Sequence, residues 1–252
     1  MIDLHSHLLP GLDDGARDLE EAIRIARSMR EDGVRVVAAT PHVRDDYPTS
    51  PGQMEAALAQ LRGAIAEAGI DLDVRGGGEI AIDRLESLDE DARARFGLGG
   101  NPKLLLLEFP YYGWPLGLAR ECARLRLDGV VPVIAHPERN ADVQERPDEI
   151  ETLVRAGAVI QLTAASVDGR LGRAPAACAR RLLELELAHL LASDAHAPGL
   201  RQAGLTAAAT SVGAELGRWL TDDVPAALLA GDALPPRPPQ QTKGGLTRWL
   251  RG

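Results

Sequence analysis

Ile2-Asp-Leu-His-Ser-His7 is a short apolar run that ends in two histidines, and its pattern recurs along the chain. In an extended strand, residues two apart point to the same face, so His5 and His7 share one side. Similar apolar runs occur at residues 34–39, 72–74 continuing towards Ile80, 104–109, 130–135, 159–162 and 190–192. Together with residues 2–5, these runs predict seven strands.

Amphipathic stretches separate the apolar runs. They cover residues 19–31, 52–68, 116–127, 147–156, 174–187 and 200–216 and predict helices. This alternation is typical of an α/β fold with a parallel sheet and helices outside it. Because most of the runs are continuously apolar, they favour a closed or nearly closed barrel. A doubly wound sheet is the competing arrangement, but the first strand-to-helix turn lacks the glycine pattern of a phosphate-binding loop.

Composition limits the class of protein. The chain has 252 residues, 45% of them hydrophobic, which suits one large domain, expected at residues 1–232. The net charge of −9 gives no overall basic field that would attract nucleic acid or anionic lipid. Two cysteines without a CxxC pattern, no secretory leader and no apolar run of about 18 residues predict a soluble cytoplasmic protein with reduced thiols.

The last twenty residues differ from the rest. Residues 233–252 begin with a segment rich in proline, glycine and polar residues, which predicts an extended linker. Residues 246–252 form a short basic and aromatic end. This end is either a frayed terminus or a docking peptide for a partner or a membrane surface, and both interpretations stay open.

Metal-competent side chains follow six of the seven predicted strands. In a parallel barrel, the carboxyl ends of the strands converge on one rim, where active sites form. The candidates are His5, His7, His42, Glu79, Glu108, His136, Asp194 and His196. They include five of the six histidines in the chain, whereas His189 precedes its strand. This distribution predicts that the eight side chains meet.

The candidate ligands also indicate which metals would bind. Imidazole and carboxylate without thiolate suit manganese, iron or zinc. Eight ligands are more than one tetrahedral site needs, so two or three ions are expected. Glu79 and Glu108 could bridge neighbouring ions and offset the repulsion between them.

Several motifs go beyond what metal binding requires. They are His5-Ser-His7, Leu9-Pro-Gly-Leu-Asp-Asp-Gly15, Ala39-Thr-Pro-His42, Gly78-Glu-Ile80, Glu108-Phe109, Ala135-His-Pro-Glu-Arg139 and Ala192-Ser-Asp-Ala-His196. Together they resemble the PHP (polymerase and histidinol phosphatase) superfamily. Within it, their order and spacing resemble the bacterial capsule-type protein-tyrosine phosphatases. The likeness covers about residues 1–210.

The resemblance implies a distorted (β/α)7 TIM-like barrel of the PHP type with two or three ions, manganese first, held by the eight ligands named above. It implies that Arg139 holds the substrate phosphate, with Arg201 as a second contact. Asp194 or His196 could supply a proton to the leaving group. The implied substrate is phosphotyrosine on a tyrosine autokinase of polysaccharide export. Thr163 stands where the family usually carries asparagine.

Other functions share parts of this pattern. A PHP phosphatase of a small molecule such as histidinol phosphate would use the same ligands, and a non-catalytic metal-stabilised scaffold would keep them for folding. A dinuclear amidohydrolase would want a lysine where Glu108 stands. A cysteine phosphatase needs C-x5-R, but Asp128 and Glu184 occupy the arginine positions after the two cysteines. Tyr111, Tyr112 and Trp114 could clamp a tyrosine ring or pack beneath a loop.

Overall fold

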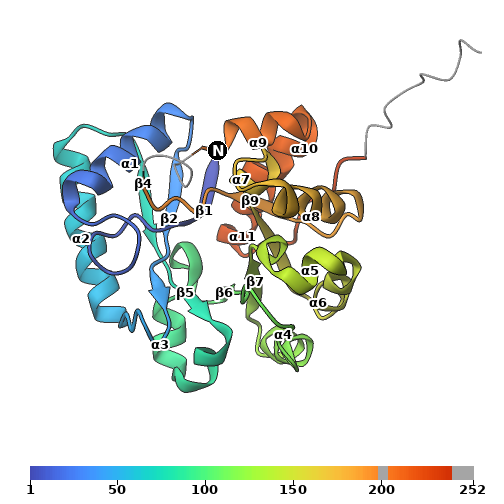
Figure 1. Cartoon of the computed structure of the whole chain (residues 1–252). Coiled ribbons are helices and arrows are strands. Elements are labelled where there is room, and N and C mark those ends of the chain that lie inside the picture. The colour runs from blue at the N-terminus through green and yellow to red at the C-terminus, as the bar shows by residue number, and fades with distance from the viewer. Residues whose placement is uncertain (198–203, 240–252) are drawn as a thin grey trace, which may run out of the picture.

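Parallel strands form the centre of the fold, and helices lie outside them (Figure 1). The computed structural model describes residues 1–197 and 204–239. The strands are β1 (Ile2–Ser6), β2 (Val36–Ala39), β3 (His42–Val43), β4 (Asp73–Gly76), β5 (Glu79–Ala81), β6 (Leu104–Glu108), β7 (Val131–Ala135), β8 (Val159–Thr163) and β9 (Leu190–Ala192). All seven predicted strands are confirmed, the third of them as the pair β4 and β5, and β3 is a further short strand that was not predicted.

The described helices alternate with the strands. They are α1 (Leu19–Glu31), α2 (Pro51–Glu67), α3 (Glu90–Arg95), α4 (Leu118–Leu127), α5 (Ala141–Glu145), α6 (Glu151–Arg155), α7 (Ala164–Val167), α8 (Arg173–Glu184), α9 (Thr206–Ser211), α10 (Ala214–Arg218) and α11 (Val224–Ala230). Short 3₁₀ turns are η1 (Ile82–Ser87), η2 (Leu98–Gly100), η3 (Pro137–Arg139) and η4 (Pro147–Ile150), and a π-helical turn covers Trp219–Asp223. In Figure 1, α1 and α2 lie beside β4 and β2, and α4 to α8 lie beside β7 and β8.

The strands form two hydrogen-bonded sheets, in the orders β1-β2-β4 and β3-β5-β6-β7-β8-β9. The sheets separate after the second predicted strand, at Thr40-Pro41, and within the third, at Gly77-Gly78. They meet again between β1 and the segment after β9, where the Asp194 N–H donates to the His5 carbonyl at 2.9 Å. The His7 N–H donates to the Ala195 carbonyl at 2.8 Å. The result is a distorted barrel with an interrupted hydrogen-bond ladder, not a regular closed one.

The interruptions have local causes. Pro41 has no N–H to donate to a ladder. The Gly78 N–H donates to the Phe96 carbonyl at 3.1 Å, outside the ladder, and an added Cβ there would lie 2.7 Å from the Phe96 ring. Beyond each break the register resumes with His42 opposite Glu79. The breaks therefore put two predicted ligands side by side at one rim.

Burial follows the sequence pattern. Every residue of β6 and β8 is buried, which confirms that continuously apolar strands have both faces covered. The predicted helix at 200–216 is wrong in its described part, because α9 and α10 are separate. Gly213, with φ +94°, lies between them. Within the described residues, no helix is long and apolar enough to cross a membrane.

The described beginning of the C-terminal segment packs against the domain. The Arg237 guanidinium donates to the Ala188 carbonyl at 2.6 Å and lies 5.1 Å from the centre of the Trp219 ring. The Trp219 indole N–H donates to the Pro235 carbonyl at 3.1 Å. The basic and aromatic end lies outside the described residues.

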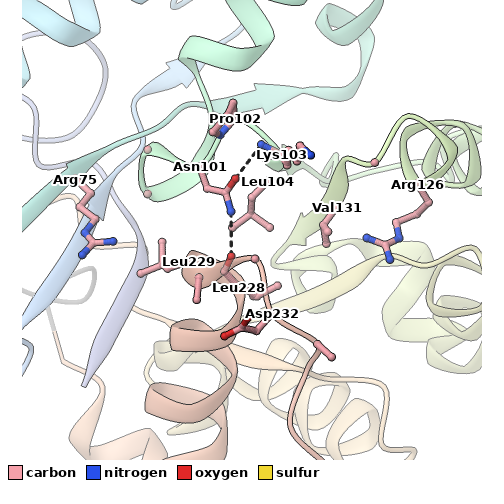
Figure 2. Close-up of a pocket in the computed structure, with 16 residues that line it drawn as sticks. Arg75, Asn101, Pro102, Lys103, Leu104, Arg126, Val131, Leu228, Leu229 and Asp232 are labelled. Carbon is pink, nitrogen blue, oxygen red and sulfur yellow. Dashed lines mark hydrogen bonds between the residues drawn. The ribbon is translucent and has the colours of Figure 1, made fainter.

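A hollow of about 850 Å³ opens at the amino ends of β6 and β7, where Leu104 and Val131 begin the strands (Figure 2). The Asn101 side chain joins its walls by donating to the Leu228 carbonyl at 3.2 Å. The eight candidate ligands lie at the opposite ends of the strands.

The loop after β1 folds back tightly onto His7. The Ala16 N–H donates to the His7 carbonyl at 3.0 Å, and an added Cβ at Gly15 would lie 2.2 Å from that carbonyl oxygen. We expect Gly15→Ala to lower the free energy of unfolding by about 1–3 kcal/mol, because the loop must shift to relieve the overlap. Urea unfolding in the presence of a chelator measures this without a contribution from bound metal.

Gly52→Ala is the matched control. Gly52 lies in α2, and nothing lies within 4 Å of its added Cβ. The control should be neutral or stabilise the protein by up to about 1 kcal/mol. Equal stability of Gly15→Ala and the unaltered chain would contradict the close packing on His7.

Candidate metal centre

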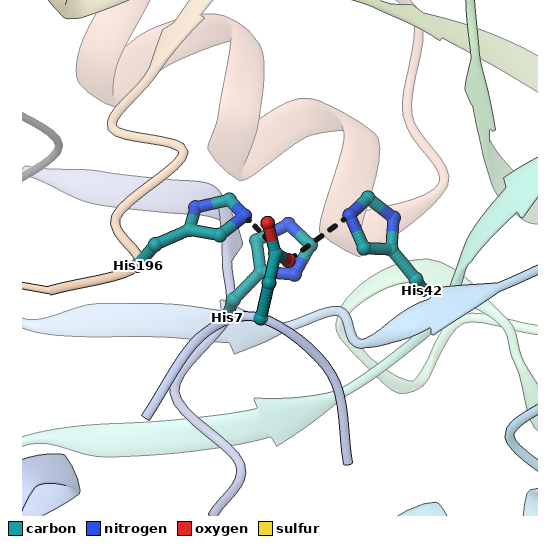
Figure 3. Close-up of side chains that lie close together, drawn as sticks. His7, His42 and His196 are labelled. Atoms are coloured by element: carbon teal, nitrogen blue, oxygen red, sulfur yellow. Dashed lines mark ion pairs between the residues drawn. The ribbon is translucent and has the colours of Figure 1, made fainter. Parts of the chain in front are cut away.

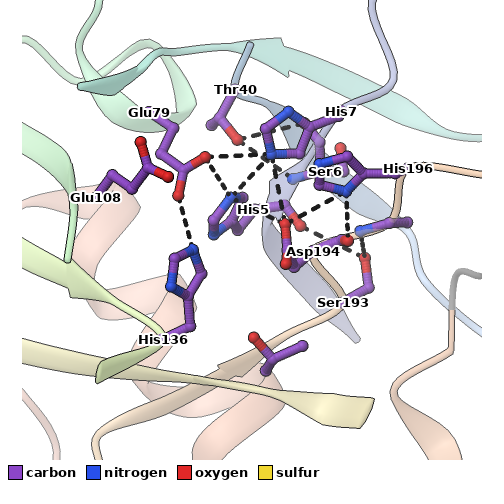
Figure 4. A network of polar contacts seen from close by, with 12 residues as sticks. His5, Ser6, His7, Thr40, Glu79, Glu108, His136, Ser193, Asp194 and His196 are labelled. Atoms are coloured by element: carbon purple, nitrogen blue, oxygen red, sulfur yellow. Dashed lines mark hydrogen bonds and ion pairs between the residues drawn. The ribbon is translucent and has the colours of Figure 1, made fainter. Parts of the chain in front are cut away.

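All eight predicted ligands meet at one rim of the barrel. Figure 4 shows them apart from His42, which is labelled in Figure 3. His42 and Glu79 begin β3 and β5, so neither closes a strand as the sequence pattern predicted. Strands β1, β3, β5 and β6 carry His5, His42, Glu79 and Glu108, and the others follow the ends of β1, β7 and β9. All eight are buried, with at most 7% of any residue exposed. So much buried polar surface requires partners, because an unpaired buried ion costs several kcal/mol.

Glu79 lies in the middle of the cluster. Its Oε2 atom lies 3.3 Å from Nε2 of both His5 and His7 and 2.9 Å from Nδ1 of His42. Its Oε1 atom lies 2.8 Å from Nε2 of His136. The short approach to His42 lacks hydrogen-bond geometry, so both atoms could turn to a shared cation once the ring has lost its proton. This carboxylate has the position of a bridging ligand.

Asp194 faces the cluster from the segment after β9. Its Oδ1 atom lies 3.4 Å from Nε2 of both His5 and His7. Those two imidazole nitrogens are 3.2 Å apart. Two nitrogens at this distance share at most one proton, so their lone pairs suit a cation.

The ligand atoms fall into four overlapping groups, each with all its atoms within 4.8 Å of one another. The groups are His7, Asp14, His42 and His196; His5, Glu79 and His136; His5, His7 and Asp194; and His42, Glu79 and Glu108. The overlap means that several ligands could serve more than one ion. The donor set therefore fits two or three neighbouring divalent ions.

Partners of the imidazoles fix which nitrogen faces the cluster. Nδ1 of His5 lies 2.9 Å from the Gln161 Oε1 atom, and Nδ1 of His7 lies 2.6 Å from the Asp13 Oδ2 atom. Because these oxygens accept a hydrogen bond from Nδ1–H, Nε2 carries the lone pair whenever the ring is neutral. Such outer hydrogen bonds orient histidine ligands in metal sites.

Two acidic residues of the cluster were missed by the sequence reasoning. Asp13 accepts hydrogen bonds from the His7 ring and, at 3.0 Å, from the His42 main-chain N–H. The Asp14 Oδ1 atom lies 3.2 Å from Nε2 of His196 and 3.4 Å from Nε2 of His42, and Figure 3 shows these two rings on either side of the carboxylate. Both aspartates belong to the motif at residues 9–15. Two adjacent carboxylates shortly after His5 and His7 in the sequence could have identified them as members of the site.

Protonation differs within the cluster. Burial, with the nearby Arg139 guanidinium, lowers the pKa of His136 to about 4, so this ring is neutral at pH 7. Burial also lowers the pKa of His42, but Asp14 and Glu79 outweigh it and raise that pKa to about 9. Burial would raise the pKa of Glu79, yet the surrounding imidazoles hold it well below its usual range. Negative charge is therefore retained at the centre.

The cysteines have no comparable activation. Burial raises the pKa of Cys122 and of Cys178 to about 12. Both thiols therefore stay protonated at pH 7, whereas the nucleophile of a cysteine phosphatase is a thiolate.

Arg139 lies on the η3 turn directly after β7. Its guanidinium pairs with Oδ2 of Asp194 and lies 5.0 Å from the centre of the Tyr111 ring. The Tyr111 ring in turn lies parallel to the His136 ring, with centres 6.2 Å apart. Arg139 thus faces the cluster from beside an aromatic ring. Arg201, the other predicted phosphate contact, lies outside the described residues.

The other aromatic candidates differ from Tyr111. Trp114 packs edge-on against Phe109, with ring centres 5.6 Å apart. Tyr112 is 82% exposed. Trp114 therefore packs beneath a loop, whereas Tyr111 contacts His136 and Arg139 at the site. Arg44, which the sequence reasoning also missed, donates to Glu108 Oε1 at 2.9 Å.

Comparisons with known proteins agree with this geometry. The family model "Capsular polysaccharide synthesis, CpsB/CapC" matches residues 1–227. The tyrosine-protein phosphatase YwqE of Bacillus subtilis is 36% identical over 249 residues, covering 96% of this chain and 97% of YwqE. The putative tyrosine-protein phosphatase CapC of Staphylococcus aureus is 31% identical, covering 78% of this chain and 77% of CapC.

A solved structure gives the same result. Crystal structures of YwqE from Bacillus subtilis and CpsB from Streptococcus pneumoniae, described as unique metal-dependent tyrosine phosphatases, include a chain that superposes with a TM-score of 0.86. It is 35% identical, and the match covers 97% of this chain and 100% of that one. The resemblance inferred from the motifs is confirmed: the chain belongs to the CpsB/CapC family of capsular polysaccharide synthesis proteins.

Proposed function

We propose that this chain is a metal-dependent phosphoesterase that hydrolyses phosphotyrosine on proteins in the cytoplasm. Its substrate would be a tyrosine autokinase of polysaccharide export. The observation that carries the proposal is the buried cluster of eight imidazole and carboxylate ligands with Arg139 beside it. The tyrosine phosphatases among the relatives and the capsule-synthesis family support the substrate class. We assign the activity to residues 1–232. Residues 233–252 stay a predicted linker and tail, although Pro235 and Arg237 at its start contact the domain.

The proposed ligands are the eight residues predicted from the sequence, and Asp14 joins them as a further candidate. Two or three ions, manganese first and iron or zinc as alternatives, fit a donor set without thiolate. When bound, such ions supply a water of low pKa and neutralise phosphoryl charge. The Nδ1 partners of His5 and His7 would keep Nε2 directed at the ions.

Arg139 would bind the phosphoryl group. A guanidinium offers two parallel N–H donors that match two phosphoryl oxygens. Its position beside Tyr111 holds the side chain at the rim of the cluster, where it already pairs with a carboxylate. A tyrosine leaving group has a pKa of about 10, so it needs little proton donation. Burial would raise the pKa of Asp194, yet His5 and the other cationic neighbours hold it well below its usual range, so Asp194 is ionised and His196 is the remaining candidate for proton donation.

Substrate class is tested by comparing two phosphate esters. After reconstitution with manganese, iron or zinc, the chain should hydrolyse a phosphotyrosyl peptide with a kcat/KM at least about tenfold above that for histidinol phosphate. This ratio corresponds to a difference of about 1.4 kcal/mol in activation free energy. The reverse order would favour the small-molecule phosphatase. Metal binding without turnover of either ester would favour the non-catalytic scaffold.

Metal dependence is tested at Glu79. The purified chain should hold at least two transition-metal ions, measured by plasma mass spectrometry, and should lose phosphatase activity to a chelator. Glu79→Gln should lower the metal content, because the amide has lost the charge that the bridging position needs. Glu20→Gln, at an exposed position on α1, is the control and should keep full metal content. An unchanged metal content in Glu79→Gln would contradict the assignment.

Phosphate binding is tested at Arg139. Arg139→Ala should keep the metal content but lower kcat/KM on a phosphotyrosyl peptide about a hundredfold, the effect of losing one preorganised charged contact. Arg139→Lys should recover only part of that loss, because lysine is a point charge. The control Arg155→Ala removes an arginine that is 75% exposed and should leave the kinetics unchanged. Near-normal kinetics in Arg139→Ala, with metal retained, would remove Arg139 from the site.

A further inference from the structure

A groove of about 860 Å³ leads away from the metal cluster, and the proposed function leaves it without a role. One end is lined by Glu108 and Arg44, which contact each other. Its walls are η1 on one side and the loop at residues 110–117 with the start of α4 on the other. Because Glu108 also belongs to a candidate ligand group, one end of the groove is formed by a side chain of the cluster.

The loop wall is unusually apolar for an exposed surface. Tyr111, Tyr112 and Leu116 are exposed by 40%, 82% and 96%. They are three of the five large hydrophobic side chains that are exposed in the described part of the chain, the others being Leu127 and Leu234. A gathering of exposed apolar side chains beside a site marks a binding surface.

This wall is held in place by the residues that follow Arg139. The Asn140 side chain donates to the main-chain carbonyls of Pro110 at 2.6 Å and Gly113 at 3.0 Å. The Gly113 N–H donates to Asp142 at 2.8 Å. A preformed wall spares a ligand the cost of ordering the loop. The same segment would therefore fix both the phosphate-binding arginine and the groove.

Tyr111 connects the two parts. It lines the groove, and its ring lies beside both His136 and the Arg139 guanidinium. A phosphotyrosine with its phosphate at Arg139 would have its ring near Tyr111. The polypeptide on either side of that tyrosine would then have to pass along the groove.

We infer that the groove binds the residues that flank phosphotyrosine in a polypeptide substrate, with apolar flanking side chains packing on Tyr112 and Leu116. The inference rests on the proposed function and extends it from the phosphorylated residue to its neighbours. The opposite wall carries the acidic side chains of Asp83 and Glu86, and Glu86 interacts electrostatically with Arg124. These carboxylates disfavour acidic flanking residues, although Arg120 at the start of α4 partly offsets them.

The test measures binding, so that it does not depend on turnover. Two short peptides carry a non-hydrolysable difluoromethylphosphonate analogue of phosphotyrosine, one flanked by leucine and one by glycine. Their dissociation constants are measured by calorimetry on the manganese-loaded chain. The leucine-flanked peptide should bind at least about tenfold more tightly, and Leu116→Asp or Tyr112→Ala should remove most of that advantage. Both positions are exposed, so the substitutions should not disturb folding.

Leu127→Asp is the matched control, because Leu127 is 88% exposed and lies at the far end of α4, outside the groove. It should keep the full difference between the peptides. Equal binding of the two peptides, or an advantage that survives both groove substitutions, would overturn the inference. A chain that shows the expected binding but hydrolyses no phosphotyrosyl peptide would overturn the proposed function and leave the groove assignment supported.

Discussion

The buried carboxylate of Glu79 is the constraint on which the rest of the site depends. It has no exposed surface, and four imidazoles from three strand regions surround it. A buried charge without compensation costs several kcal/mol, so positive charge must accompany it, as protons on the imidazoles or as bound metal. Because ligands must release protons to bind a cation, metal binding and protonation of this cluster compete.

The interruptions of the barrel place that carboxylate. If the second and third strand regions continued without a break, residues 36–43 and 73–81 would stay in one ladder. The breaks at Pro41 and at Gly77-Gly78 transfer the chain from one sheet to the other, and His42 and Glu79 begin the new register as a pair. Irregular backbone at this rim thus serves the site, and the buried core of β6 and β8 supplies the rigid support.

The sequence predicted the parts that depend on local pattern. Strand ends follow from apolar periodicity, and parallel strands bring their ends together, so all eight ligands could be named without coordinates. The position of Asp14 could not, because it depends on how the loop folds back on His7. The pairing of Arg139 with Asp194 joins residues 55 positions apart and depends on β7 and β9 both being present in one sheet. Helix 200–216 was misjudged because amphipathic spacing continues across Gly213.

Phosphate binding and substrate recognition share one segment of this chain. Arg139 ends the η3 turn, Asn140 caps α5 through the Val143 N–H, and the same asparagine holds the loop that carries Tyr111. The Ala141 N–H donates to the Tyr111 carbonyl at 3.0 Å and adds a second tie. A shift of this short segment would therefore move the arginine and the groove wall together. Hydrogen bonds to main-chain carbonyls thus couple the position of the phosphate-binding arginine to the position of the groove wall. A substitution that moves one of them would also move the other.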